Sequence, residues 1–329
     1  MESSLSGVEP FFSIIIPTRN RVELFSEALA SVIAQDFASK EIIVVVDGAN
    51  DVDLAAYRGM VEPHSNVRLV SLCGTTNGHG PGRTRNIGVA NSKGRYIAFL
   101  DDDDIWTDLQ HLAHAERNLV GERAAPELYF SSQIARRPDG STVEPNPWIA
   151  EICDLLSKNT PEGHGRLVDA TQLLNCRGFA HLNCAIFRAD FYRALGGLDE
   201  SLVYEEDRDI FLRSLDRATK IMVRPANIGV HRVPAKSVND NLSTSIAMVS
   251  KRLIQLYIYD KNYASAEQDL IREYCREGKM FQLQHLYAHF VDSADFLRAK
   301  HYAAQVRACG GNVLWSLRSW VSALRARLS

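Results

Sequence analysis

The sequence predicts an α/β protein with a doubly wound, mostly parallel sheet flanked by helices, followed by an α-helical C-terminal region. Strand and helix signals alternate over the first hundred residues, which is typical of right-handed βαβ units. The stretch 41–47 is apolar on consecutive residues, as in a strand that is buried on both faces of a parallel sheet. From about residue 245 onward, apolar and charged residues mix at helical spacing without a strong strand signal.

Four short apolar runs predict the first strands of the sheet. A proline at position 17 stops the first run, and the last run leads directly into four aspartates. We expect these strands at residues 13–16, 41–47, 67–72 and 96–100. The glycine-rich stretch 74–82 predicts a loop between the third strand and the following helix.

Helix signals follow the first and the fourth strand. Asn20 and Glu23 have the spacing of a capping box, and Thr107 and Gln110 repeat that spacing. The first of these helices has one apolar face, formed by Phe25, Ala28, Leu29, Val32 and Ile33. Residues 136–164 are rich in proline, glycine and polar residues, which predicts a long loop or flap beside the site.

Composition and charge narrow the class of protein. The 329 residues carry a formal net charge of −3, which gives no overall attraction for nucleic acid. Residues 1–10 lack the apolar core of a secretory signal, and no apolar run has the length of a membrane span. The six cysteines have the spacing of neither a zinc site nor a disulfide framework. We therefore expect reduced thiols and a cytoplasmic protein.

Polar residues follow the predicted strands where the strands end. In a doubly wound sheet the ligand binds at the carboxyl ends of the strands, so residues 17–20, Asp47 and residues 101–104 are expected to share one crevice. Four adjacent carboxylates repel one another and need a counter-charge, and hard oxygen ligands suit Mg²⁺ or Mn²⁺. The alternative is a solvated acidic turn that caps the next helix. The apolar strand before the turn favours the cation, because it delivers the acids to the crevice.

Six short motifs occur in the order and at the spacing of a known family. They are Pro17-Thr18-Arg19-Asn20, Val45-Val46-Asp47-Gly48, Arg85-Asn86-x-Gly88, Phe99-Leu100-Asp101-x-Asp103-Asp104-x-Trp106, Gly196-Gly197-Leu198-Asp199-Glu200 and Glu206-Asp207-x-Asp209. Together they resemble the family 2 glycosyltransferases over about residues 12–231. The resemblance implies a GT-A fold and inverting, metal-dependent transfer of a sugar from a nucleotide-diphosphate donor to an acceptor hydroxyl.

The resemblance also implies a domain organisation. A glycosyltransferase domain would span residues 1–244, and an α-helical region would span residues 245–329. Within the first domain, the nucleotide-sugar half would cover about residues 11–106 and the acceptor half about residues 107–244.

A donor-binding set follows from the same resemblance: Pro17, Thr18, Arg19, Asn20, Asp47, Arg85, Asp101 and Asp102. The carboxylate of Asp47 can accept a hydrogen bond from the imide of uracil or thymine, which favours a UDP- or dTDP-sugar. Val46 stands where the family usually has the first of two acids. The implied ligands of Mn²⁺ or Mg²⁺ are Asp103, Asp101 and His231.

Glu206 and Asp207 are the candidate catalytic pair. A carboxylate within hydrogen-bond reach of the acceptor hydroxyl can take its proton, and the resemblance makes Asp207 the first choice and Glu206 the second. The alternative is that Asp207 and Asp209 only pair with arginines on one helix, because acidic helix starts are common. Acceptor contacts are expected from His181, Asn183 and Asp209.

The C-terminal end is basic, and no acid follows Asp295. Apolar residues recur at helical spacing in 313–328, which is typical of an amphipathic helix at the surface of an anionic membrane. The same pattern suits a helix that packs on its neighbours or forms a dimer contact, so an oligomer is an open alternative.

The function expected from these features is sugar transfer to a glycan or lipid-linked glycan acceptor, in bacterial surface polysaccharide or lipopolysaccharide synthesis at the inner face of the cell membrane. Two other functions are considered. A sugar-phosphate nucleotidyltransferase would need a glycine-rich loop after the first strand, where residues 17–20 have no glycine. A catalytically degenerate binding or assembly module is supported only by Val46.

Overall fold

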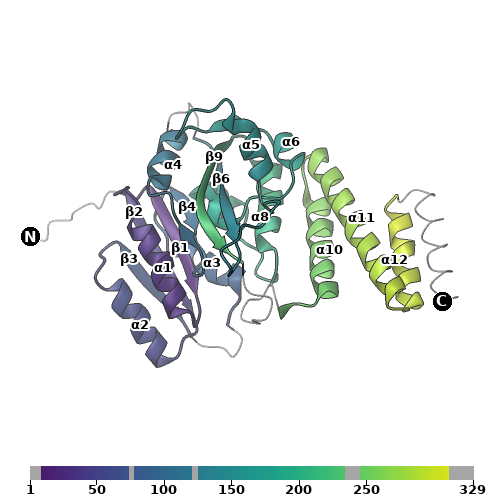
Figure 1. Ribbon diagram of the computed structural model, residues 1–329, viewed down its shortest axis with the longest axis horizontal. Helices are drawn as coiled ribbons and strands as arrows, with labels where there is room; N and C mark the ends of the chain where they lie inside the picture. The colour runs from purple at the N-terminus through teal and green to yellow at the C-terminus, as the bar shows by residue number, and fades with distance from the viewer. Residues whose placement is uncertain (1–8, 74–77, 121–124, 234–244, 311–329) are drawn as a thin grey trace, which may run out of the picture. The chain divides into compact units, whose positions relative to one another are not determined.

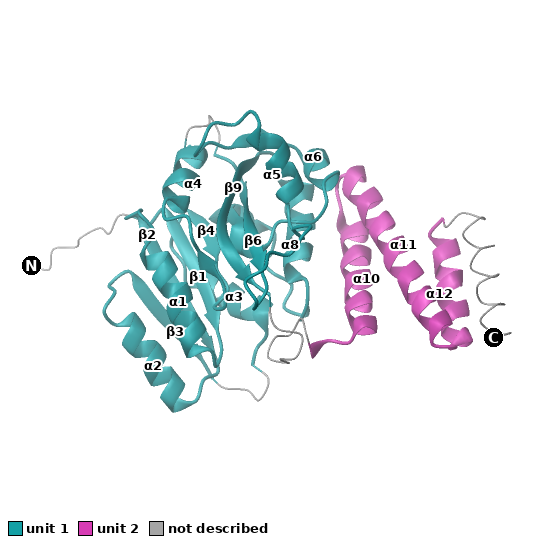
Figure 2. Ribbon diagram, viewed as in Figure 1, with its two compact units in different colours: residues 1–237 teal, residues 238–329 magenta. Residues whose placement is uncertain are grey.

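The computed structural model describes residues 9–73, 78–120, 125–233 and 245–310. The chain divides into two compact units, unit 1 (residues 1–237) and unit 2 (residues 238–329), as Figures 1 and 2 show. Unit 1 combines a sheet with helices, and the described part of unit 2 is helical. The predicted fold class, including the helical C-terminal region, is confirmed.

One mixed sheet forms the centre of unit 1, with the strand order β3-β2-β1-β4-β8-β6-β9-β5 and with β7 paired to β9. Its strands are β1 (Phe12–Thr18), β2 (Lys40–Asp47), β3 (Val67–Leu72), β4 (Tyr96–Phe99), β5 (Ile105–Trp106), β6 (Leu128–Arg136), β7 (Arg166–Val168), β8 (Ala185–Arg188) and β9 (Ile221–Arg232). The strands β1, β2, β3 and β4 are parallel. β8 is antiparallel to both β4 and β6, and β6 is parallel to β9. The carboxyl ends of β1, β2, β4 and β9 therefore lie at the same edge of the sheet.

Helices pack on both faces of this sheet. In unit 1 they are α1 (Val22–Ile33), α2 (Asp51–Val61), α3 (Pro81–Ala90), α4 (His111–Val120), α5 (Ala150–Ser157), α6 (Ala170–Leu174), α7 (Ala189–Ala194) and α8 (Glu206–Arg217). Ile14 and Ile16 of β1 belong to the same core cluster as Phe25 of α1. Ile15 points the other way, because a Cβ added to Gly88 of α3 would lie 2.3 Å from its Cγ2. The two helices thus cover opposite faces, as expected of a doubly wound sheet.

Unit 2 contains α10 (Met248–Ser265), α11 (Asp269–Asp292) and α12 (Phe296–Ala308). They share a core that includes Leu256, Leu286 and Val306. Gly278 lets α11 approach α10 closely, since an added Cβ would lie 2.4 Å from the Tyr259 ring. None of the described helices has both the length and the apolarity needed to cross a membrane. The predicted amphipathic helix 313–328 lies outside the described residues.

Local expectations about helix starts were wrong at two places. The N-cap of α1 is Arg21, with no side-chain cap, and Asn20 has a positive φ of 54°, so it cannot serve as the capping residue. Before α4, the side chain that accepts from the Gln110 N–H belongs to Asp108, one residue after the expected Thr107. At both helix starts a neighbouring polar residue, Arg21 or Asp108, replaces the residue expected there. Contacts with distant parts of the chain hold that residue in place.

Two element boundaries also differ from the expectation. β1 continues through Pro17 to Thr18, because its pairing with β4 ends at Ile15 and the missing N–H costs no hydrogen bond on that side. The stretch 136–164, expected as a loop, contains α5, whose Ile152 and Cys153 are buried.

Candidate active site

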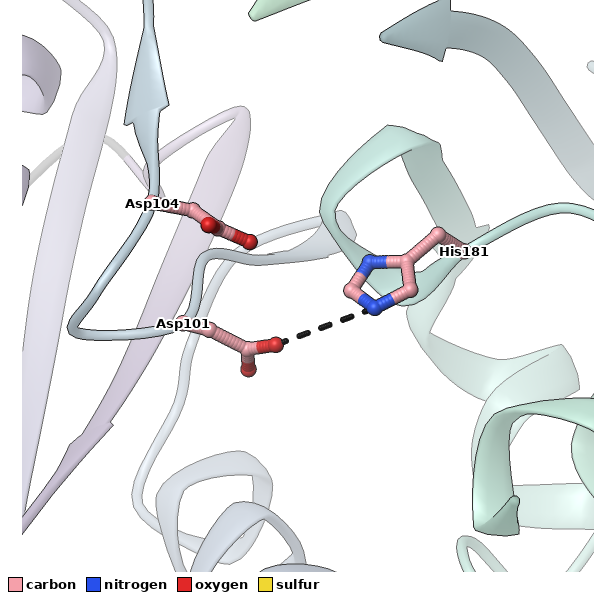
Figure 3. A group of neighbouring side chains, drawn as sticks. All are labelled: Asp101, Asp104 and His181. Atoms are coloured by element: carbon pink, nitrogen blue, oxygen red, sulfur yellow. Dashed lines mark ion pairs between the residues drawn. The ribbon is translucent and has the colours of Figure 1, made fainter. Parts of the chain in front are cut away.

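The acid loop, residues 101–104, begins one residue after β4 and lies at the shared carboxyl edge of the sheet. Figure 3 shows Asp101 and Asp104 of this loop facing His181, which precedes the short 3₁₀ turn Leu182–Cys184. His181 Nε2 lies 3.9 Å from Asp101 Oδ2 and 3.9 Å from Asp207 Oδ2. The structure therefore brings the acid loop and the start of α8 together on one imidazole, although they are about a hundred residues apart in sequence.

Arg85 of α3 contacts both the acid loop and the start of α8. Its guanidinium donates to Asp101 and, at 2.9 Å, to Glu206 Oε1. Burial works against the charge of Arg85, but the carboxylates of Asp101 and Glu206 outweigh burial and raise its pKa. Burial likewise opposes ionisation of Asp101, but Arg85 prevails and lowers the pKa of Asp101 to about 2. Close packing of α3 on β1 at Gly88 sets the position of Arg85.

Asp207 is ionised much less readily than Asp101. It lies in the first turn of α8, after Glu205, which adopts the left-handed conformation with φ of 56°. Burial raises the pKa of Asp207, and the neighbouring Glu205 carboxylate raises it further. Burial also raises the pKa of Glu206, against the opposing charge of Arg85. A carboxyl group whose pKa is raised in this way is suited to accept a proton at neutral pH.

Two carboxylates and the imidazole of His181 form a group that could hold a divalent cation. One ligand atom each from Asp101, Asp104 and His181 lies within 4.8 Å of the others. Two carboxylate oxygens and one imidazole nitrogen form a donor set that suits Mn²⁺ and accepts Mg²⁺. Burial lowers the pKa of His181 to about 4, so the imidazole is neutral at pH 7 and has a lone pair to offer. These residues therefore fit the cation that the sequence predicts.

The expected ligand set was Asp101, Asp103 and His231, and the cluster in the structure differs from it in two members. Asp103 accepts from Arg21 at 2.8 Å. His231 Nδ1 lies 2.7 Å from Asp104 Oδ2, and the carboxylate of Asp104 outweighs burial and raises the pKa of His231 to about 9. A protonated imidazole is a poor ligand, so His231 supports Asp104 in this arrangement. The roles of Asp103 and His231 as ligands stay predictions.

Asp102 of the acid loop accepts hydrogen bonds from the end of β1 and from the residues that follow it. Its carboxylate accepts from the Thr18 hydroxyl at 2.8 Å and from the Arg21 guanidinium at 3.2 Å. The backbone N–H of Arg19 also points to it, at 3.4 Å. The predicted donor residues Pro17 to Asn20 are thus at the same edge as the acid loop. Their roles toward a nucleotide stay predictions.

Asp47 ends β2 and holds the turn before α3. Its carboxylate accepts from the backbone N–H of His79 at 2.8 Å and of Gly80 at 3.3 Å, and lies 2.6 Å from His79 Nδ1. Gly78 has a positive φ, and a Cβ added there would lie 2.6 Å from Asp47 Oδ2. The expected base-binding carboxylate is therefore covered by this turn.

Two of the three expected acceptor residues make contacts within the protein, and their roles toward an acceptor stay predictions. Asn183 is buried, accepts from the Asp101 N–H at 3.0 Å and donates to Asp104. Asp209 is completely buried and pairs with Arg213 at 2.8 Å, which corresponds to the alternative considered from the sequence. His181 alone of the three lies at the centre of the site.

Sequence reasoning missed Trp148 and His79 of this site, and it placed Asp104 in the crevice without naming it as a metal ligand. Trp148 packs edge-on against the rings of His181 and His231, with centroids 5.3 and 4.8 Å apart. His79 contacts Asp47, and Asp104 replaces Asp103 in the cluster. Trp148 lies in a stretch that was expected to be a loop, and a single aromatic residue in a loop carries no sequence signal of its own. The glycines on both sides of His79 belong to the stretch 74–82 that predicts a loop, but they do not indicate a contact with Asp47.

Comparison with known proteins defines the class. Residues 13–121 match the family described as glycosyl transferase family 2. This region contains nearly all of β1, together with β2, β3, β4, the acid loop and α4, so it includes the sheet edge at which the acid loop lies. These residues are therefore similar to the family 2 glycosyltransferases, as their motifs indicated.

Similar curated proteins match about three tenths of the chain. An uncharacterized glycosyltransferase of Haemophilus influenzae is 32% identical over 95 residues, which are 29% of this chain and 37% of that protein. The GalNAc(5)-diNAcBac-PP-undecaprenol beta-1,3-glucosyltransferase of Campylobacter jejuni is also 32% identical over 95 residues, 29% of this chain and 30% of that one. The matched segment spans between 15% and 37% of the first three relatives.

Solved structures share the fold. Staphylococcus aureus TarS 1–349 in complex with UDP-GlcNAc has a TM-score of 0.61 at 19% identity, covering 95% of this chain and 79% of that one. The mannosyltransferase PcManGT from Pyrobaculum calidifontis, in complex with GDP-Man and Mn²⁺, has a TM-score of 0.54 at 14% identity, covering 97% and 88%. At this identity the likeness concerns the fold, which is of the GT-A type.

Proposed function

We propose that this protein is an inverting glycosyltransferase that moves a sugar from a nucleotide-diphosphate donor, with UDP- or dTDP-sugars favoured, to a hydroxyl of a glycan or lipid-linked glycan. The observation that carries the proposal is that Asp101 and Asp207 both lie beside His181, each with a carboxylate oxygen 3.9 Å from its Nε2. One carboxylate stays ionised beside the donor edge, and the other has a raised pKa, as a general base requires.

Arg85, Asp207 and Glu206 have different roles in the proposed transfer. Arg85 lies between Asp101 and Glu206 and supplies positive charge where the diphosphate leaves. Asp207 accepts the proton of the acceptor hydroxyl as its oxygen attacks the anomeric carbon, and the bond to the diphosphate breaks on the opposite face. Direct attack on one face inverts the anomeric centre. Glu206, paired with Arg85, holds that guanidinium in place.

Asp101, Asp104 and His181 would hold a Mn²⁺ or Mg²⁺ ion, which when bound neutralises charge on the leaving diphosphate. The PcManGT complex contains Mn²⁺, and the TarS complex contains UDP-GlcNAc, which supports a metal and a nucleotide-sugar here. The undecaprenol-linked substrate in the name of the Campylobacter jejuni relative supports a lipid-linked acceptor in surface polysaccharide synthesis. Attachment to the membrane through residues 313–328 belongs to the same proposal.

Calorimetry with UDP, dTDP, GDP and CDP, each with Mn²⁺ and with chelator, tests the donor site. We expect metal-dependent binding of one nucleotide, retained in Asp207→Asn and lost in Asp101→Asn. Slow hydrolysis of the matching nucleotide-sugar then tests catalysis, and Asp207→Asn should abolish it. Failure of all four nucleotides to bind the folded wild-type protein would contradict the proposal and favour a non-catalytic binding module.

A further inference from the structure

A polar cavity lies in unit 1, and its lining contains no residue of the acid loop. Its volume is about 380 Å³, and it is bounded by β6, β9, α5 and the segment 142–146. This volume is at the lower end of the range for small-molecule sites, about 300–1,000 Å³. The register between β6 and β9 shifts on both sides of Ser132, which pairs with Asn227. The irregular pairing opens the space between the strands and α5.

The lining of the cavity is polar and lacks cationic residues among the described ones. Neutral side chains come from Ser132, Thr142, Ser157 and Asn227, and carboxylates come from Glu144 and Asp154. The two carboxylates disfavour a phosphate or diphosphate group. Hydroxyl, amide and carboxylate groups together can both donate to and accept from the hydroxyls of an uncharged sugar.

Ser132 gives a second, independent sign of a ligand. Its side chain is only 2% exposed, and within the described chain its Oγ has no hydrogen-bond partner. A buried hydroxyl without a partner is costly, and a ligand or an ordered water in the cavity would satisfy it. The segment 142–146 forms another wall of the cavity. Asn146 fixes it in place by donating to the carbonyl of Gln133 at 2.7 Å.

The cavity is linked to the active site through the segment that follows it. The side chain of Asn146 accepts from the Trp148 N–H at 3.1 Å, and the Trp148 ring packs against His181 and His231. Along β9, Asn227 precedes His231 by four residues, which is roughly 13 Å of extended strand. Neither Asp207 nor His181 lines the cavity, so a sugar held there is not the one that receives the new bond.

We propose that this cavity is a subsite for an uncharged sugar unit of the acceptor, separated along the glycan from the hydroxyl that is glycosylated. The inference rests on the proposed function, since it assigns the acceptor class for the same transfer. Acceptor recognition then depends on a sugar unit that takes no part in the reaction. This uncharged unit binds in the cavity beside the carboxylates of Glu144 and Asp154.

Ligand-observed NMR on the full chain tests the subsite with a panel of neutral methyl glycosides as probes: the glucoside, galactoside, mannoside, rhamnoside and N-acetylglucosaminide. We expect saturation transfer to at least one of them that UDP with Mn²⁺ does not compete away. Ser157→Trp fills the cavity from an exposed position on α5 and should abolish the signal, and Ser132→Ala should weaken it severalfold. Leu155→Trp, which is exposed on the same helix and outside the cavity, should leave it unchanged.

Asn227→Trp is a second filling variant from the opposite wall, and circular dichroism confirms that each variant is folded. Signals that survive both filling variants, or that UDP competes away, would overturn the subsite. So would binding of sn-glycerol 3-phosphate in preference to every neutral glycoside. Metal-dependent UDP binding without any glycoside signal would overturn the subsite and leave the proposed function standing. Glycoside binding that depends on the cavity, without binding of any nucleotide, would do the reverse.

Discussion

Asp101 and Asp207 are the same kind of residue, lie at equal distances from one imidazole, and differ in their ionisation. Asp101 is buried but contacts Arg85, which lowers its pKa to about 2. Asp207 is buried too, but its close charged neighbour is Glu205, and its pKa is raised. Burial opposes ionisation of both carboxylates, so the difference between them comes from the charge beside each one.

The largest effect is expected from Asp207→Asn. The amide keeps the size of the side chain but cannot accept the acceptor proton, so kcat should fall by roughly 10² to 10⁴. Nucleotide affinity should change little, because Asp101 and Arg85 are intact. Steady-state kinetics and calorimetry on the same preparation measure both quantities. A variant that keeps more than a tenth of the wild-type kcat would show that Asp207 is not the base.

Arg85→Met removes the positive charge that distinguishes Asp101 from Asp207. It leaves Asp101 and Glu206 buried without their shared cation, which should lower the free energy of unfolding by about 3–5 kcal/mol. Urea denaturation measures this change. Arg83→Met, an exposed position on the same helix, is the matched control and should have an effect near zero. Equal stability of the two variants would mean that the acid loop does not need Arg85.

The pH profile sharpens the difference between the two acids. Asp207 must be ionised to act as a base, and its pKa is raised, so kcat/KM should fall as the pH drops through that raised value. The fall should approach tenfold per pH unit and begin well above the ordinary pKa of an aspartate, about 3.9. The residual activity of Asp207→Asn should lack this limb. A wild-type profile that stays flat down to pH 5 would contradict a raised pKa for Asp207.

The smallest effect is expected from Gly88→Ala, which moves the helix that carries Arg85. The new Cβ would lie 2.3 Å from Ile15 Cγ2 and 3.2 Å from Val45 Cγ2, and such overpacking costs about 1–3 kcal/mol. Gly59→Ala is the matched control on α2, since nothing lies within 4 Å of its added Cβ. Its better helix propensity should stabilise the protein by up to about 1 kcal/mol. Thermal or urea unfolding of both variants should therefore shift in opposite directions.

Much of the sheet edge that carries the acid loop could be predicted from the sequence. Buried parallel strands are continuous apolar runs, and their carboxyl ends meet by topology. The sequence therefore predicts one crevice for residues 17–20, Asp47 and residues 101–104. The identity of the partners could not be predicted. Asp103 and Asp104 are adjacent in sequence and point in different directions, and only the tertiary contacts of Arg21 and His231 decide which of them joins the cluster with Asp101.

The second half of unit 1 was harder to predict for a related reason. β8 and β6 are antiparallel neighbours formed from distant segments, and their pairing has no local signal. Trp148 and the cavity beside it depend on α5, a short helix within a stretch whose prolines and glycines indicate a loop. Capping was misjudged for the same reason: Asn20 and Thr107 have the right side chains, but the backbone is set by contacts to other strands.

The turn over Asp47 has a consequence for the kinetics of donor binding. Because the carboxylate already contacts His79 and Gly80, a nucleotide base that uses Asp47 must exchange those partners for its own. The affinity gained at this position is the difference between two sets of hydrogen bonds, which is smaller than either set alone. Association then includes a rearrangement of residues 78–80, so the association rate constant would fall below that of a diffusional encounter, and donor affinity would depend on how readily this short turn yields.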